Sequence, residues 1–315
     1  MQFLSAQHID AVLDWDGVLR ALNTAHLGPR PEGNSFFLGN ADYGMLSRGV
    51  ILPGSGAGLK IASIYPANSC ANPPRPVEDA AFVVIDEETK SISAILEGPA
   101  ITRWKTAADS ALAATKLSRE DSKVLLVLGA GPVARALVDA YLHIRPSIQE
   151  VLLWNRTASK LTTTCAALQA QGVNASVVNN LNFAIAKADI ITSATSSNTP
   201  LIGSEFVRSG THVDLVGGYR LDMQEAESTL LARVRIFVDD RSTSATSGDI
   251  QIPLREGLIN ENRIEGDLYD LCQNNYLSRK EADITVYKNS GGAHLDLVVS
   301  QYVIKKLLEN KQLRM

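Results

Sequence analysis

The segment that most restricts the fold is "VLGAGPVA", residues 127–134, which follows an apolar run and opens a helical pattern. It places Gly129, Gly131 and Ala134 at G-x-G-x-x-A spacing. In a strand–turn–helix unit the first glycine permits a tight turn, and the second lets a pyrophosphate approach the backbone. The small third residue lets the helix pack closely on the strand. The N–H groups at the start of the helix then face the phosphates. In this context the segment predicts a Rossmann-type dinucleotide site, and the alternative is a turn that only joins a strand to a helix.

From Lys123 onward the sequence has the pattern of a doubly wound parallel sheet, because short apolar runs alternate with helical segments. We expect strands at residues 123–129, 150–155, 175–178, 189–195, 211–217, 235–240 and 284–289, and helices at residues 132–144 and 159–172, the second ending at Gly172. The pattern of residues 291–312 predicts an amphipathic helix, which follows the last strand and returns to the first domain.

The first third of the chain is different. A helical pattern over residues 6–23 gives way to turns rich in Gly, Pro and Ser, which separate β-patterned runs at residues 59–65, 80–86 and 91–97. These runs predict an antiparallel or mixed sheet. A second helical pattern covers residues 102–118.

Composition excludes several classes of protein. A chain of 315 residues favours two domains, and a net charge of -4 gives no basic surface for nucleic acid. No apolar stretch is long enough to span a membrane, and the first residues lack the basic start of a signal peptide, so we expect a cytoplasmic protein. Cys70, Cys165 and Cys272 have no metal-site spacing, so we expect no metal and read each as a buried or half-buried apolar residue.

The end of the second expected strand indicates the cofactor. An NAD-preferring site usually carries an acidic residue there, but this chain has Asn155, Arg156 and Thr157, with Lys160 one turn later. An arginine pairs with a 2'-phosphate through charge-assisted hydrogen bonds. We therefore expect NADPH, with NADH left open because Arg156 is otherwise an ordinary surface residue.

The chain resembles the ornithine cyclodeaminase/mu-crystallin family. The resemblance runs over most of the chain in the family's order: "LKIASIYPAN", "ITRWKTAADSALA", "LGAGPVARA", "LLWNRT", "ATSSNTPLI", "VDLVGG", "FVDD", "SGDI" and "ITVYKNSGGAHLDL". It implies a Rossmann domain, residues 119–293, inserted into an α+β substrate-binding and dimerisation domain, residues 1–118 plus 294–315. It also implies a homodimer.

One departure from the family pattern bears on the reaction. The resemblance implies that cyclodeaminases place an aspartate shortly after the "VDLVG" strand, where this chain has Tyr219. Tyrosine, with an ordinary pKa near 10, does not replace a carboxylate base at neutral pH. Ornithine cyclodeamination is therefore disfavoured. Asp222 lies three residues further on, and we expect it to cap a helix.

The resemblance also implies the catalytic residues. Lys60 matches the family's lysine, and a lysine in an apolar strand is costly to bury unless it meets an anion. Lys105 stands where the family usually carries an arginine, so it supplies charge without a bidentate fork. Either Arg103 or Arg48 supplies the missing fork. We assign the family's early substrate arginine to Arg48, with Arg30 as the alternative.

The proton donor is left open. Ser47 is one candidate, although a structural serine is an equally good interpretation, and His294 is another, although a histidine near a helix start more often caps or packs. The expected cofactor-binding residues also include Thr106, Pro132, Val133, Thr195 and Val216.

The resemblance thus implies NAD(P)H-dependent reduction of a small cyclic ketimine carboxylate, with Δ1-pyrroline-2-carboxylate to L-proline as the leading case. The six-membered Δ1-piperideine-2-carboxylate differs by one methylene, which a pocket discriminates weakly. Two alternatives stay open: another amino-acid dehydrogenase or a cyclodeaminase of the family, and a non-enzymatic crystallin-like NADPH-binding protein.

Overall fold

The computed structural model describes residues 1–40, 42–73, 75–273 and 279–312. The chain forms two compact units, Met1–Lys105 with Gly292–Met315, and Thr106–Gly291. The first division falls inside the helix α3 (Gly98–Leu117), whereas the boundary expected after residue 118 leaves this helix whole. No helix in the described part is long and apolar enough to cross a membrane.

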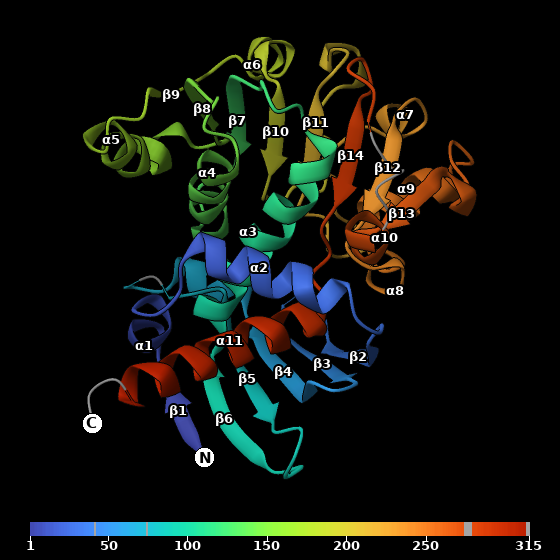
Figure 1. Cartoon of the computed structure of the whole chain (residues 1–315). Helices are drawn as coiled ribbons and strands as arrows, with labels where there is room; N and C mark the ends of the chain where they lie inside the picture. Colours follow the sequence, from blue (N-terminus) through green and yellow to red (C-terminus); the bar gives the residue numbers. More distant parts are fainter. Residues whose placement is uncertain (41, 74, 274–278, 313–315) are drawn as a thin grey trace. The chain divides into compact units, whose positions relative to one another are not determined.

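The first unit is built on a six-stranded mixed sheet in the order β1-β6-β5-β4-β3-β2. Only the β1–β6 pair is parallel. Its strands are β1 (Gln2–Leu4), β2 (Glu32–Gly39), β3 (Gly44–Leu52), β4 (Gly56–Ile64), β5 (Glu78–Ile85) and β6 (Ile92–Glu97). Its helices are α1 (Ala6–Asp10), α2 (Trp15–His26) and α11 (Ala293–Gln312), together with the start of α3. Figure 1 shows α11 crossing the sheet beside α2, and α11 contacts β3, β4 and β5.

The single helix expected over residues 6–23 is wrong, because the chain forms two helices there. The first helix ends at Asp10, and Asp14 caps the second, its side chain accepting a hydrogen bond from the Gly17 N–H at 2.7 Å. An aspartate at this position stabilises a helix start more than a helix interior. The cysteine prediction also fails at one position, since Cys70 is exposed while Cys165 is buried and Cys272 is half-buried.

The second unit contains an eight-stranded sheet in the order β13-β12-β14-β11-β10-β7-β8-β9, with every described pair parallel. Its strands are β7 (Val124–Leu128), β8 (Glu150–Trp154), β9 (Ala175–Val177), β10 (Ile190–Ser193), β11 (His212–Leu215), β12 (Arg235–Val238), β13 (Ile264–Asp267) and β14 (Thr285–Lys288). The strand order reverses between β7 and β10, the usual place for a ligand in such sheets. The predicted Rossmann-type sheet is confirmed.

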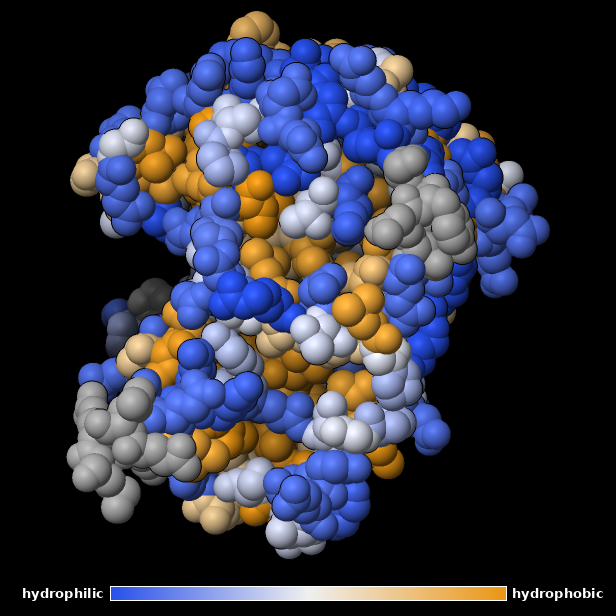
Figure 2. All heavy atoms as spheres, in the orientation of Figure 1, coloured by the Kyte–Doolittle hydropathy of each residue, from blue (hydrophilic) through white to orange (hydrophobic). Residues whose placement is uncertain are grey.

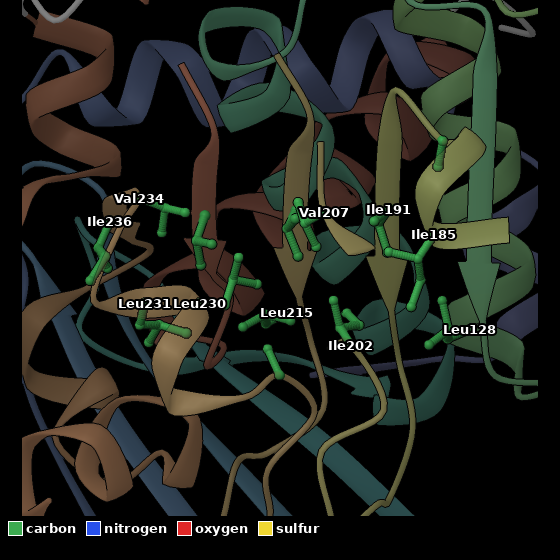
Figure 3. Packing of buried hydrophobic residues seen from close by; sticks show 14 of the residues in the cluster. Leu128, Ile185, Ile191, Ile202, Val207, Leu215, Leu230, Leu231, Val234 and Ile236 are labelled. Atoms are coloured by element: carbon green, nitrogen blue, oxygen red, sulfur yellow. The ribbon is translucent and has the colours of Figure 1, made fainter. Parts of the chain in front are cut away.

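Helices cover this sheet. They are α4 (Pro132–Ile144), α5 (Thr162–Ala170), α6 (Leu181–Lys187), α7 (Ser228–Leu231), α8 (Arg241–Ser244), α9 (Gly248–Arg255) and α10 (Leu268–Gln273). Ile185 of α6 lies beside Ile191 of β10 in the apolar core, which Leu215 of β11 and Leu230 of α7 extend (Figure 3). The strands are apolar on both faces because both faces are covered. In the view of Figure 2 the upper surface, over these helices, is mostly hydrophilic.

Candidate active site

Three of the predicted catalytic residues meet in the first unit. Lys60 of β4 is the direct cross-strand partner of Arg48 of β3, so both side chains lie on one face of the sheet. The Lys60 Nζ lies 3.8 Å from Oδ1 of Asp296, at the start of α11, and the Lys105 Nζ of α3 lies 3.3 Å from its Oδ2. We call Arg48, Lys60, Lys105 and Asp296 the cationic cluster. Tertiary contact assembles it, since its members come from four elements.

Burial makes this cluster electrostatically unusual. Lys60, Lys105 and Asp296 are 7%, 3% and 1% exposed. Burial lowers the pKa of Lys60, and Asp296 acts against that shift. Burial alone raises the pKa of Asp296, but Lys105 and Lys60 outweigh it, so the carboxyl has a pKa below its ordinary value. The buried Asp296 carboxylate and the two buried lysines thus oppose the effect of burial on one another.

The balance of charge in the cluster is positive. Three cations face the carboxylate of Asp296, and Glu78 of β5, which is 44% exposed, lies 4.0 Å from the Lys60 Nζ. Two buried ammonium groups that share one buried carboxylate are costly unless further anions approach them. The cluster is thus suited to bind a small carboxylate.

Two polar side chains at this cluster were not predicted. The Lys60 Nζ donates a hydrogen bond to the Thr102 Oγ1 of α3 at 2.7 Å, which brings a hydroxyl to the cluster. Asp296 was also missed, because the "HLDL" stretch has the ordinary pattern of a helix start. The only sequence signal for either residue is its place inside a segment that resembles the family.

The structure does not bring Ser47 into the cationic cluster. Neighbouring residues of a strand point to opposite faces, so Ser47 lies on the other side of the sheet from Arg48. Its Oγ donates a 3.4 Å hydrogen bond to the Lys60 backbone carbonyl. The structural interpretation of this serine is therefore the better one.

The alternative arginines and His294 also lie in other surroundings. Arg103 pairs with Asp10 of α1, its terminal nitrogen lying 2.5 and 2.7 Å from the two carboxylate oxygens, while Arg30 is exposed ahead of β2. His294 is buried, with its Nε2 3.3 Å from the Nε2 of His26. These contacts favour Arg48 as the arginine of the cluster and a packing role for His294.

In the second unit the glycine turn has the geometry that a dinucleotide requires. Gly129 has φ +119°, and a Cβ there would lie 2.5 Å from the Ala194 carbonyl oxygen. Gly131 caps α4, and a Cβ there would meet no atom within 4 Å. Open space above Gly131, with Pro132 exposed and Val133 half-buried at the start of the helix, leaves room for phosphates at the N-terminus.

The end of β8 adjoins this turn, because the Gly129 N–H donates to the Trp154 carbonyl at 2.9 Å. The Asn155 Nδ2 donates to the Thr157 carbonyl at 2.9 Å and closes the following turn. Arg156 and Lys160 are exposed. The strand end thus offers cationic side chains in place of the carboxylate that would repel a 2'-phosphate.

Three further predicted cofactor residues lie at or beside the ends of this sheet. Val216 follows β11 and donates its N–H to the Ser193 carbonyl at 2.8 Å, while the Thr106 carbonyl accepts from the Asn289 Nδ2 at 3.0 Å. Thr195 follows β10, and its N–H and Oγ1 both donate to the Glu225 Oε1, at 2.8 and 2.7 Å.

Glu225 was not predicted from the sequence, although it holds the Thr195 loop. Its Oε1 also accepts from the Ser193 Oγ at 2.5 Å, and its N–H donates to the Asp249 Oδ1 at 2.7 Å. Burial raises the pKa of this carboxyl, and Asp249 adds to the shift. Asp249 pairs in turn with Lys288, 3.1 Å away.

The loop after β11 lacks the cyclodeaminase carboxylate, and the predicted capping role of Asp222 is wrong. Asp222 is exposed and pairs with Arg220, which donates to it at 2.9 and 2.8 Å. The next helix, α7, begins only at Ser228, after Glu227. The Asp222 carboxylate therefore forms an ion pair with Arg220 and does not cap a helix. Among the described residues no group of three or more His, Cys, Asp and Glu side chains could hold a metal.

Fold and site together define a two-unit protein with a Rossmann-type dinucleotide turn in one unit and a cluster of cationic side chains in the other. The chain belongs to the ornithine cyclodeaminase/mu-crystallin family, whose model matches residues 52–311. It is 38% identical over 306 residues, 96% of each chain, to a Delta(1)-pyrroline-2-carboxylate reductase of Paracoccus denitrificans.

Two solved structures have a similar fold. The Delta(1)-pyrroline-2-carboxylate reductase of Thermococcus litoralis, in complex with NADH and L-proline, matches with a TM-score of 0.93 at 26% identity over 99% of this chain and 98% of that one. An archaeal alanine dehydrogenase dimer with bound NAD matches with a TM-score of 0.89 at 22% identity over 98% and 96%, which shows a common fold.

Proposed function

We propose that this chain is an NAD(P)H-dependent reductase of a cyclic ketimine carboxylate, with Δ1-pyrroline-2-carboxylate to L-proline as its leading reaction. The observation that carries the proposal is the meeting of two buried lysines, Lys60 and Lys105, at Asp296, with the half-buried Arg48 directly opposite Lys60. An anionic substrate completes this cluster, and the reductase similar to this chain over its whole length supports the choice of that substrate.

The residues of the first unit bind and orient the substrate in this proposal. Arg48 offers a planar fork that matches a carboxylate, while Lys60 and Lys105 add two point charges. The burial of the two lysines strengthens the attraction, because little water competes. The proton for the imine nitrogen comes from a hydroxyl or a water held there.

In the second unit the open turn at Gly131 and the start of α4 hold the pyrophosphate, and Arg156 and Lys160 bind the 2'-phosphate of NADPH. NADH is the alternative cofactor, since the turn itself does not distinguish the two. When bound, the reduced nicotinamide supplies the hydride for the imine carbon. The chain's contribution is positioning and electrostatics.

Tyr219 argues against ornithine cyclodeamination as the main activity, since no carboxylate stands at that position. The deciding experiment follows NADPH oxidation by the purified chain with Δ1-pyrroline-2-carboxylate, Δ1-piperideine-2-carboxylate, and pyruvate with ammonia. A parallel assay supplies L-ornithine without reductant. Turnover of the cyclic imines supports the proposal. The proposal would be refuted if the chain turned over only L-ornithine, or only pyruvate with ammonia. Tight NADPH binding without turnover of any substrate would also refute it.

We also infer that the first unit pairs with a second copy of the chain. On the sheet face opposite Lys60, apolar side chains are exposed: Phe36 by 53%, Ile51 by 56% and Ile61 by 41%. The helix α11 packs on the Lys60 face and contacts β3, β4 and β5. Exposed apolar side chains on three neighbouring strands are typical of an interface.

We place the enzyme in the cytoplasm. All three cysteines are free and Cys70 is exposed, which is typical of a reducing compartment where NADPH is abundant.

A further inference from the structure

Asp296 links two cations that arrive from different parts of the chain. It lies in the first turn of α11, where the helix dipole favours a negative charge, and it contacts Lys60 of β4 and Lys105 of α3 with its two oxygens. Without a carboxylate between them, two buried ammonium groups repel each other. The position of Asp296 therefore determines how closely the two lysines approach.

The surroundings of Lys60 identify which groups control its charge. Its Nζ faces the Thr102 hydroxyl of α3, the cations Arg48 and Lys105, and the carboxylates Glu78 and Asp296. Burial lowers the pKa of Lys60, and Asp296 is the strongest influence in the opposite direction. Glu78 acts more weakly, because it is partly exposed to solvent.

We infer that Asp296 is a positioning residue of the carboxylate site: it holds Lys60 and Lys105 together and keeps both available as cations for the substrate. Asp296 need not touch the substrate to do so. The inference rests on the proposed function for its catalytic consequence, and on the ion pairs alone for its effect on the lysines.

The direct test is Asp296→Asn, which keeps the shape and removes the charge. The loss of Asp296 lowers the pKa of Lys60, so the variant should differ least from the wild type at acidic pH, and at about pH 6.5 we expect a KM for the imine carboxylate within about 3-fold of the wild type. As pH rises, Lys60 loses its proton earlier in the variant. By about pH 9 we expect KM to rise at least ~10-fold over the wild type at the same pH, with kcat changing less.

The matched control is Glu309→Gln on the same helix, where the carboxylate pairs with Lys306 at 3.4 Å and is 43% exposed. This variant should keep the wild-type pH profile. Lys105→Gln provides a test of opposite sign. Removing a cation beside Lys60 raises the pKa of Lys60, so the rise of KM at alkaline pH should begin at a higher pH than in the wild type.

A measurement without turnover separates this inference from the proposed function. Lys60 has a lower pKa in the folded chain than in the unfolded chain, so the unfolded chain binds more protons between the two values and stability rises with pH there. In Asp296→Asn this rise should begin at a lower pH than in Glu309→Gln, as measured by urea unfolding of the chain without ligand.

The outcomes are distinct. A shifted stability profile in a chain that reduces no imine refutes the proposed function and supports the role of Asp296. Imine turnover with a pH-independent loss in Asp296→Asn, or with no shift in either profile, overturns the inference. If Asp296→Asn does not fold, the inference is overturned equally by a Lys105→Gln variant whose KM rises at the same alkaline pH as that of the wild type.

Discussion

Arg48 and Lys60 lie directly opposite each other on β3 and β4, on the sheet face that α11 covers. This pairing puts a guanidinium fork beside a buried ammonium. Arg103, the other candidate arginine, is bound to Asp10 instead. The two arginines therefore make a matched pair of test positions.

Replacing Arg48 with Met should raise the KM for the imine carboxylate about 10- to 100-fold, because a hydrogen bond to a charged group contributes about 1.5–3 kcal/mol. Arg103→Met should leave this KM nearly unchanged. Steady-state kinetics with saturating NADPH measure both. An equal loss in the two variants would remove Arg48 from the site.

The cofactor preference should depend on Arg156. Arg156→Ser is expected to raise the KM for NADPH about 10- to 100-fold by loss of the phosphate contact, while the KM for NADH changes less than about 2-fold. Arg255→Ser, at another exposed arginine, serves as the control. A parallel change for both cofactors would contradict the assignment.

The two glycines of the turn should respond differently to alanine. Gly131→Ala meets no atom within 4 Å, so stability should hold while the KM for NADPH rises at least ~10-fold. Gly129→Ala forces a side chain onto φ +119° and against the Ala194 carbonyl, so unfolding should become easier by about 1–3 kcal/mol. Urea unfolding and cofactor titration distinguish the two effects.

Asp214 of β11 should give the stability a pH dependence. Burial raises the pKa of Asp214 to about 6, although Thr192 and Ser110 donate hydrogen bonds to it at 2.6 and 2.9 Å. The folded chain therefore retains a proton that the unfolded chain has lost. The stability falls as the pH rises from the ordinary pKa of an aspartate toward about 6. Between about pH 4.5 and about pH 6.5 the wild type should lose ~2 kcal/mol relative to Asp214→Asn.

Urea unfolding at several pH values measures this difference. Asp121→Asn, which removes an exposed carboxylate, should follow the wild type. Parallel curves for the wild type and Asp214→Asn would show that Asp214 ionises normally in the folded chain.

The apolar sheet face should control assembly. Ile61→Lys places a charge at the centre of this face and should yield monomers in sedimentation velocity, whereas Leu258→Lys, at an exposed apolar residue of the second unit, should not. A wild-type chain that sediments as a monomer would exclude the dimer.

Local pattern accounts for most of the fold. The strands of the second unit are continuous apolar runs, and the helix at Pro132–Ile144 matches its predicted residues, because period and capping act over a few residues. The error over residues 6–23 arose where an aspartate in an amphipathic pattern caps a new helix. Local propensity does not decide that choice, since Asp14 suits either an exposed helix position or a cap.

For the site, the sequence by itself determined the glycine turn and the cationic end of β8, because these features are contiguous and their chemistry follows from residue type and spacing. It also supplied Lys60, Lys105 and Arg48 through resemblance. Only the tertiary structure decided that these cations meet around Asp296, that Ser47 faces the other way, and that Glu225 holds the Thr195 loop. Such contacts join residues distant in the chain, and burial, which determines their charge, exists only once the chain has folded.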